Sequence, residues 1–235
     1  MILSYRHRFI FVHLPKTAGS SVAAYLSRYL GPWDIYLGSV GDARRYGGRI
    51  NIRTRLDHVH PRSLKDTAKR LIIDRRFKLR QKPMYRPMSP ATAHARASEI
   101  QSYYPQAWDR SFVFCFTRNP WERLVSLYRW QSRSRNMPAF TEFLEMAAHK
   151  PERYLSSPAY TIDGRIAVDF IGRYEYLHED LCNICERIGL PFESGLLPHA
   201  KDSPAYDYRE YYGAKHKDLV ASICRDEIEM FGYEF

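Results

Sequence analysis

The sequence predicts an α/β fold: a three-layer sandwich in which a central, mostly parallel sheet is flanked by helices. Two short apolar runs carry this prediction, residues 9–14 and 112–117. Each run leads into a polar loop and then an amphipathic segment, which is the order of a β–α unit. Continuous apolar runs indicate strands buried on both faces, as parallel strands are. We expect one domain over residues 1–235, because that length is enough for one full core.

The first β–α unit carries a candidate phosphate site. A helix that opens on small hydroxyl residues offers unpaired backbone N–H groups and a positive dipole end to an anion, so this part of the fold is P-loop-like. Lys16 supplies a mobile charge, Gly19 lets a ligand approach the backbone, and Ser20 or Ser21 can cap the helix or bond a phosphate oxygen. An ordinary strand–turn–helix is the alternative for this segment alone. The candidate phosphate-binding residues are Pro15, Lys16, Thr17, Ala18, Gly19, Ser20 and Ser21.

The second β–α unit places a cation at the same edge of the predicted sheet. Arg118 directly follows the run 112–117, and Pro120 suits the first turn of the next helix. Arg118 should therefore lie at the carboxyl end of its strand, where open α/β sheets bind ligands. Ser126 lies two turns into that helix, on a face that can look back at the crevice. A solvated helix serine is the alternative for Ser126.

The remaining elements follow from periodicity and from the position of Gly and Pro. The turn at Asp163-Gly164 is typical of a β-hairpin. Cys182 and Cys185 form a C-x-x-C on a helical pattern without a second pair, which favours helix packing over a metal site. The predicted elements, in order, are helices at 63–77, 91–104 and 138–149, a hairpin around 163–164, a strand at 167–174, and helices at 177–188 and 215–230.

The two phosphate motifs together resemble the sulfotransferases that use 3′-phosphoadenosine 5′-phosphosulfate (PAPS), specifically the carbohydrate (Golgi-type) branch and its bacterial relatives. The resemblance covers nearly the whole chain. It continues through residues 93–97, 168–175, 197–199 and 231–235.

This resemblance assigns roles to the residues already named. It implies that residues 15–21 bind the 5′-phosphosulfate end of PAPS and that Arg118 and Ser126 bind its 3′-phosphate. Sulfuryl transfer depends mainly on positioning and electrostatics, and Lys16 is the candidate for neutralising the leaving oxygen. PAPS is the expected co-substrate, and no metal is expected. The expected acceptor is a hydroxyl on a carbohydrate, although a lipid-linked sugar, a small alcohol or a tyrosyl peptide presents the same group.

A histidine is the expected base, because an unperturbed pKa near 6.5 lets it accept a proton at neutral pH. Of the nine histidines, His94 precedes the Arg118 strand on a helix expected to cross the cleft mouth. The resemblance also places it where relatives have a catalytic histidine. His58 and His60, an H-x-H in the basic region, are the alternative and can also face the acceptor.

Three further polar residues are near the predicted strand ends or the later motifs. His199 and Lys201 are candidates for lining it on the acceptor side. His13 lies inside the first predicted strand, where a core histidine is the expected reading.

The positive charge of the chain is concentrated in a basic insertion, at about residues 44–90, between the two motifs. Fifteen Lys or Arg against three Asp give +12 between Arg44 and Arg86, so with a total of +10 the rest of the chain carries −2. Such a segment suits an anionic acceptor, for example a sulfated or uronate-bearing glycan. A solvated helix face is the alternative.

Two other classes of protein fit less well. A P-loop nucleotide kinase would need G-x-x-x-x-G-K-[ST], but here Lys16 precedes Gly19. A nucleic-acid-binding module could use the +12 segment, but no aromatic RNA platform or zinc-finger pattern accompanies it, so no nucleic-acid partner is expected.

Compartment is predicted from what the sequence does not contain. No segment approaches the roughly 20 apolar residues of a membrane span, and the N-terminus lacks the apolar stretch of a signal peptide. We expect a soluble cytoplasmic enzyme of bacterial or viral origin, unless the chain is a trimmed Golgi luminal domain.

Overall fold

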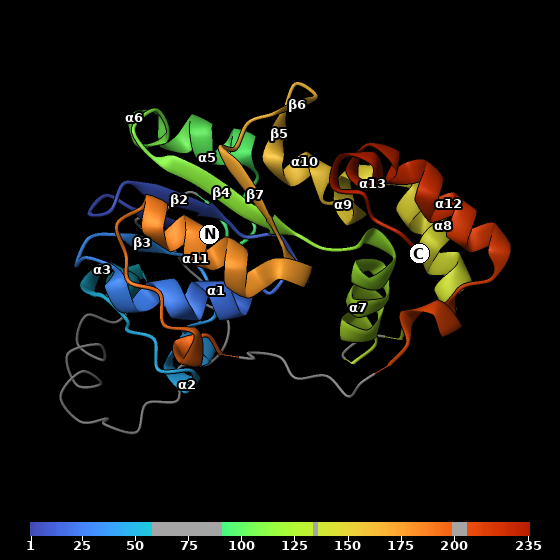
Figure 1. The fold of residues 1–235 in the computed structure, drawn as a ribbon, viewed down its shortest axis with the longest axis horizontal. Helices are drawn as coiled ribbons and strands as arrows, with labels where there is room; N and C mark the ends of the chain where they lie inside the picture. The colour runs from blue at the N-terminus through green and yellow to red at the C-terminus, as the bar shows by residue number, and fades with distance from the viewer. Residues whose placement is uncertain (58–90, 134–135, 199–205) are drawn as a thin grey trace, which may run out of the picture.

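The computed structural model describes residues 1–57, 91–133, 136–198 and 206–235 (Figure 1). Its centre is a five-stranded sheet in the spatial order β3-β1-β2-β4-β7. β2, β4 and β7 are parallel, and β1 runs antiparallel to both of its neighbours. The predicted α/β fold with a mostly parallel sheet is therefore confirmed. The strands are β1 (Ile2–Ser4), β2 (Phe9–Val12), β3 (Ile35–Tyr36), β4 (Phe112–Thr117) and β7 (Phe170–Arg173).

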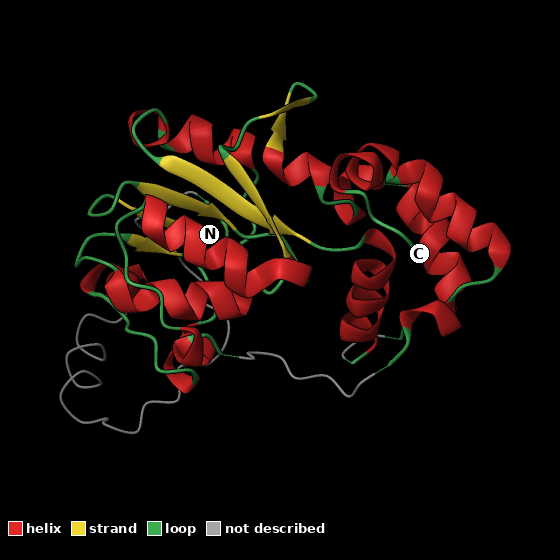
Figure 2. Ribbon diagram, viewed as in Figure 1, coloured by secondary structure: helices red, strands yellow, loops and turns green. Residues whose placement is uncertain are grey.

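Alternate residues of the central strands face two separate hydrophobic cores. Phe9 and Phe11 of β2 pack in one cluster with residues of α1 (Gly19–Leu26) and α11 (Leu177–Arg187). Ile10 and Val12 pack in the other, with residues of α5 (Ala97–Tyr103). The side-chain period of two along a strand produces this division. Both faces are covered by helices (Figure 2), which is why the strands read as continuous apolar runs.

A third hydrophobic cluster lies beside the carboxyl ends of the strands. It joins helices α7, α8 and α12 with the last residues of the chain, and in Figure 1 these helices stand next to the sheet rather than over its faces. The pocket described below lies where this helical group meets the sheet. The helices of this region are α7 (Pro120–Ser132), α8 (Phe140–His149), α9 (Pro151–Tyr154), α10 (Ser157–Tyr160), α12 (Ala214–Ile223) and α13 (Arg225–Phe231).

Short elements account for most of what the sequence prediction omitted. β1 and β3 have three and two residues, too few to show a periodicity; β1 joins the sheet by pairing with β2, and β3 by pairing with β1. The hairpin of β5 (Thr161–Ile162) and β6 (Arg165–Ile166) turns at Asp163 and Gly164, as predicted. The other short elements are α2 (Val40–Arg45), α3 (Ile52–Asp57), α6 (Pro105–Trp108) and single 3-10 turns at Ser27–Tyr29, Tyr174–Tyr176, Ser194–Leu196 and Tyr208–Tyr211.

Two helix predictions are wrong in detail. The helix expected from about residue 91 begins only at Ala97, because Arg96 is extended and its N–H donates to the Glu99 carboxylate at 2.7 Å, which caps the helix there. The helix expected over 215–230 is divided between α12 and α13 at Cys224, whose backbone is not helical. The helix expected at 63–77 and most of the basic insertion lie outside the described residues. Within the described ranges, no helix is both long and apolar enough to cross a bilayer.

Candidate active site

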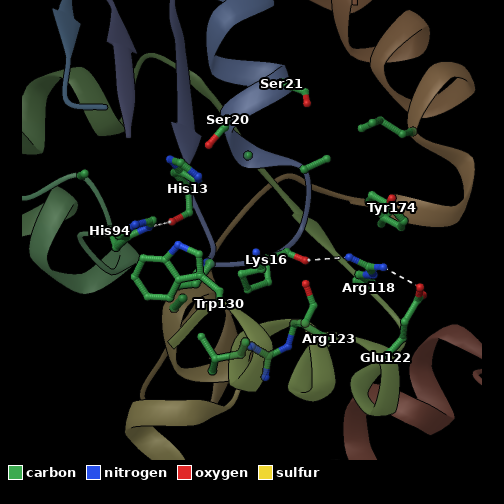
Figure 3. A pocket seen from close by; sticks show the side chains of 18 of the residues that line it. His13, Lys16, Ser20, Ser21, His94, Arg118, Glu122, Arg123, Trp130 and Tyr174 are labelled. Atoms are coloured by element: carbon green, nitrogen blue, oxygen red, sulfur yellow. Dashed lines mark hydrogen bonds and ion pairs between the residues drawn. The ribbon is translucent and has the colours of Figure 1, made fainter. Parts of the chain in front are cut away.

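A cavity of about 1240 Å³ lies at the carboxyl ends of β2, β4 and β7, where doubly wound sheets bind ligands (Figure 3). Segments far apart in the sequence line it: the loop after β2, the turn before α5, helix α7, helix α9 and the segment after β7. Its volume exceeds the roughly 300–1,000 Å³ of a typical single-ligand site. The cavity therefore has room for two reactants.

The loop between β2 and α1 has the backbone of an anion cradle. Lys16 and Ala18 have positive φ angles of 69° and 59°, which for residues with a side chain are strained. The N–H groups of Ser21 and Val22 donate to the carbonyl oxygen of Ala18 at 2.8 and 3.1 Å. No side chain caps α1, so the N–H groups of Gly19 and Ser20, which precede those bonded to Ala18, are the candidates for binding an anion.

All but one of the predicted loop residues line the cavity. Thr17 does not: it is completely buried, and its hydroxyl donates to the Leu14 carbonyl at 3.2 Å. The Thr17 side chain thus holds the loop in shape, and only its backbone remains a candidate for binding a ligand. The residues of the loop that do line the cavity are Pro15, Lys16, Ala18, Gly19, Ser20 and Ser21.

The side chain of His13 leaves no space for any residue but glycine at position 19. A Cβ atom at this position would lie 2.0 Å from Cδ2 of His13. The glycine therefore does not serve to admit a ligand, as the sequence suggests, because the imidazole fills the space beside its Cα. His13 itself is half-buried and lines the cavity, so the expectation of a core histidine is wrong. β2 ends at Val12, which places His13 at the carboxyl edge of the sheet.

Gly19→Ala is expected to damage the site because the added methyl group must displace the His13 ring or the start of α1. We predict a Tm several degrees lower and a weaker affinity for 3′-phosphoadenosine 5′-phosphate (PAP), measured by differential scanning calorimetry and titration calorimetry. Gly195→Ala is the matched control, since nothing lies within 4 Å of a Cβ at that position. Equal Tm and PAP affinity in the two variants would contradict this account.

Arg118 extends from the end of β4 into the cavity and is held by several contacts. Its Nη2 lies 2.5 Å from Glu122 Oε1, its Nη1 makes a long 3.5 Å contact with the Lys16 carbonyl, and its Cζ stands 4.0 Å from the centre of the Tyr174 ring. Burial by itself lowers the pKa of Arg118, but the hydrogen bond and charge of Glu122 outweigh it and the net shift is upward. The guanidinium is therefore charged, and its buried Nε has no acceptor among the described residues.

The loop that carries Arg118 is fixed at its next residue. The Asn119 side chain caps α7 by accepting from the Trp121 N–H at 3.1 Å. The Asn119 N–H donates to Glu175 Oε1 at 2.7 Å, and its side-chain amide donates to the Glu234 carbonyl at the same distance. Glu175 therefore binds the Arg118 loop, and Arg173 stacks over Tyr176 at 4.1 Å. Ser126, two turns into α7, lines the same cavity.

A buried carboxylate supports the end of β4. The hydroxyl of Thr117, the residue before Arg118, donates to the Glu227 carboxylate of α13. Glu227 is only 3% exposed, and burial raises its pKa although the charge of Arg123 opposes this shift. Helix α13 is thus tied to the strand end that presents Arg118.

His94 lies in the turn before α5 and not on a helix. Its side chain is exposed and faces the cavity together with His13 and Lys16 (Figure 3). His94 Nδ1 lies 2.9 Å from the carbonyl oxygen of His13, and the two rings are 4.6 Å apart. Because a carbonyl oxygen only accepts hydrogen bonds, this contact holds the proton on Nδ1. Nε2 is then the nitrogen that can accept a proton.

Some cavity residues were not found from the sequence. Arg123 is 2% exposed and donates through Nη2 to the Tyr154 carbonyl, and Trp130 is 49% exposed. Trp130 follows Ser126 by four residues, so the helical period that places Ser126 at the crevice also places Trp130 there. Arg96 and Arg153 also line the cavity. The predicted acceptor-side residues His58, His60, His199 and Lys201 lie outside the described residues.

Comparison with known proteins agrees with this geometry. The model of a family described as the sulfotransferase family matches residues 1–234. A curated protein of Archaeoglobus fulgidus, described as uncharacterized, is 41% identical over 91 residues, which cover 37% of this chain and 74% of that protein. No solved structure matches the chain.

Proposed function

Because the chain belongs to the sulfotransferase family, we propose that it moves a sulfuryl group from PAPS to a carbohydrate hydroxyl by in-line transfer, with His94 as the base. One observation carries the proposal. The loop after β2 and Arg118 after β4, two separate candidate anion sites, line the same cavity as His94. Two anion sites in one cavity suit a nucleotide that is charged at both its 5′ and its 3′ end.

The residues present fit such a donor. The uncapped start of α1 and the Lys16 ammonium would hold the 5′-phosphosulfate end. Arg118 has a buried Nε without an acceptor among the described residues, and with Ser126 it would hold the 3′-phosphate. Tyr174, which lies beside Arg118, and Tyr176 both line the cavity and offer aromatic faces to a base.

The bound donor supplies an electrophilic sulfur, and the protein supplies position and charge. His94 Nε2 accepts the proton of the acceptor hydroxyl as that oxygen bonds to sulfur. Lys16, in the cradle, neutralises the charge that develops on the oxygen leaving sulfur. The strained loop and the buried Arg118 hold their positions before the reaction, so little reorganisation is needed.

No observation on the described residues favours the two other functions considered, a nucleotide kinase and a nucleic-acid-binding module. The kinase hypothesis has no matching motif. The hypothesis of a nucleic-acid-binding module rests on residues 44–86, most of which lie outside the described residues.

Donor recognition is tested by nucleotide affinity. PAP is expected to bind at least tenfold more tightly than AMP, because AMP lacks the anion for Arg118 and Ser126 and charge-assisted bonds contribute about 1.5–3 kcal/mol each. Titration calorimetry measures both affinities. Arg118→Ala should abolish the preference, whereas Arg187→Ala should keep it, since Arg187 stacks over Phe112 at the opposite end of β4. Equal affinity of the wild-type protein for PAP and AMP would refute the proposal.

A further inference from the structure

Arg118 already has an anionic partner in the structure. Its Nη2 lies 2.5 Å from Oε1 of Glu122, four residues further along the chain in the first turn of α7. Figure 3 shows the guanidinium between the loop after β2 and this carboxylate. Both residues line the cavity. A 3′-phosphate that binds Arg118 therefore meets a carboxylate at the same guanidinium.

Glu122 occupies the nitrogen of Arg118 that a phosphate needs most. A guanidinium binds a phosphate through two parallel N–H bonds, from Nε and Nη2 or from Nη1 and Nη2, so Nη2 belongs to both pairs. In Arg118, Nε has no acceptor among the described residues, and Nη1 makes only a 3.5 Å contact with the Lys16 carbonyl. The Glu122 carboxylate therefore blocks one pair and stands beside any anion on the other.

The two partners of this ion pair differ in how firmly they are held. The Arg118 side chain is 11% exposed and lies against the Tyr174 ring, whereas the Glu122 side chain is 28% exposed. Glu122 also stands in the first turn of α7, where the helix dipole favours a negative charge even without Arg118. The carboxylate can therefore turn toward solvent while Arg118 stays in place.

We infer that Glu122 is a displaceable counter-ion of Arg118, which the 3′-phosphate of a nucleotide must displace in order to bind. The displacement lowers the affinity for every nucleotide with a 3′-phosphate, PAPS and PAP alike, and leaves binding of the 5′ end in the loop after β2 unaffected. Lower affinity means faster dissociation of the product PAP, and product release often limits turnover. The inference rests on the proposed function and concerns product release from that same site.

The test compares Glu122→Gln with the wild-type full chain, by titration calorimetry with PAP and with AMP. Glutamine keeps the shape of the side chain and removes its charge. PAP is expected to bind the variant about fivefold or more tightly, because its 3′-phosphate brings about two negative charges close to this carboxylate. The affinity for AMP, which has no 3′-phosphate, should stay within about twofold, the usual effect of one partly exposed charge.

A second variant, a rate measurement and a control complete the test. Glu122→Ala removes the same carboxylate together with its hydrogen bond to Arg118, so its gain in PAP affinity should be at least as large. The dissociation rate of labelled PAP, measured in a chase with excess unlabelled PAP, should fall by about the same factor as the dissociation constant. Glu145→Gln is the matched control, because it removes an exposed carboxylate that lies 3.8 Å from Lys215 and outside the cavity lining. It should bind PAP like the wild-type protein.

The sign of the change decides between two roles for Glu122. If both Glu122 variants bind PAP with unchanged or weaker affinity while their AMP affinity shows that they are folded, the carboxylate supports Arg118 and the inference is wrong. Equal tightening of PAP and AMP would also overturn it, because the charge would then act on the whole cavity. A wild-type protein that does not prefer PAP over AMP would instead refute the proposed function, so the two failures are distinguishable.

Discussion

Replacing His94 by alanine is expected to lower kcat by about 10²–10⁴-fold and to leave the dissociation constant of PAP nearly unchanged. In the proposed mechanism the imidazole acts on the acceptor proton in the transition state; in the structure its Nδ1 bonds the His13 carbonyl and its ring lies 4.6 Å from the His13 ring. Turnover is measured with a sulfur-labelled donor, and PAP affinity by calorimetry.

His149→Ala is the matched control for this variant. His149 is also exposed, and its Nδ1 lies 2.7 Å from the Glu145 carbonyl, but it does not line the cavity. If His94→Ala keeps wild-type turnover while His58→Ala or His60→Ala abolishes it, the base lies in the basic insertion and the assignment of His94 is wrong.

Lys16→Ala is expected to reduce kcat by about 10²–10³-fold and, unlike His94→Ala, to weaken PAP binding as well. The ammonium meets phosphate charge in the ground state before it meets the charge that develops on the leaving oxygen. Lys16 also has a positive φ, so the alanine variant keeps a strained backbone and isolates the loss of the side chain.

The control for Lys16 is Lys215→Ala, which removes an exposed ammonium 3.8 Å from Glu145. A Lys16→Ala variant with reduced turnover but unchanged PAP affinity would mean that the ammonium does not contact the nucleotide before reaction. In that case its role in the cradle would have to be withdrawn.

The central part of the fold could be predicted because its signal is local. β2 and β4 are continuous apolar runs, and the polar loop after each begins where the run ends. Strand direction then decides that Arg118 and the loop after β2 reach the same edge of the sheet. The cavity residues Trp130, Arg96 and Arg153 could not be predicted in this way, because they come from three separate segments with no shared motif.

The sequence by itself thus determined the parallel core, the loop between β2 and α1, and the strand end that carries Arg118, since each depends on a few adjacent residues. Only the tertiary structure decided which side chains meet in the cavity. His13 and His94 are 81 positions apart and meet because β2 ends beside the turn before α5. Thr17 turned away from the cavity to bond Leu14, and Gly19 made room for the His13 ring. Such contacts depend on how distant segments pack, and no local pattern of residues encodes them.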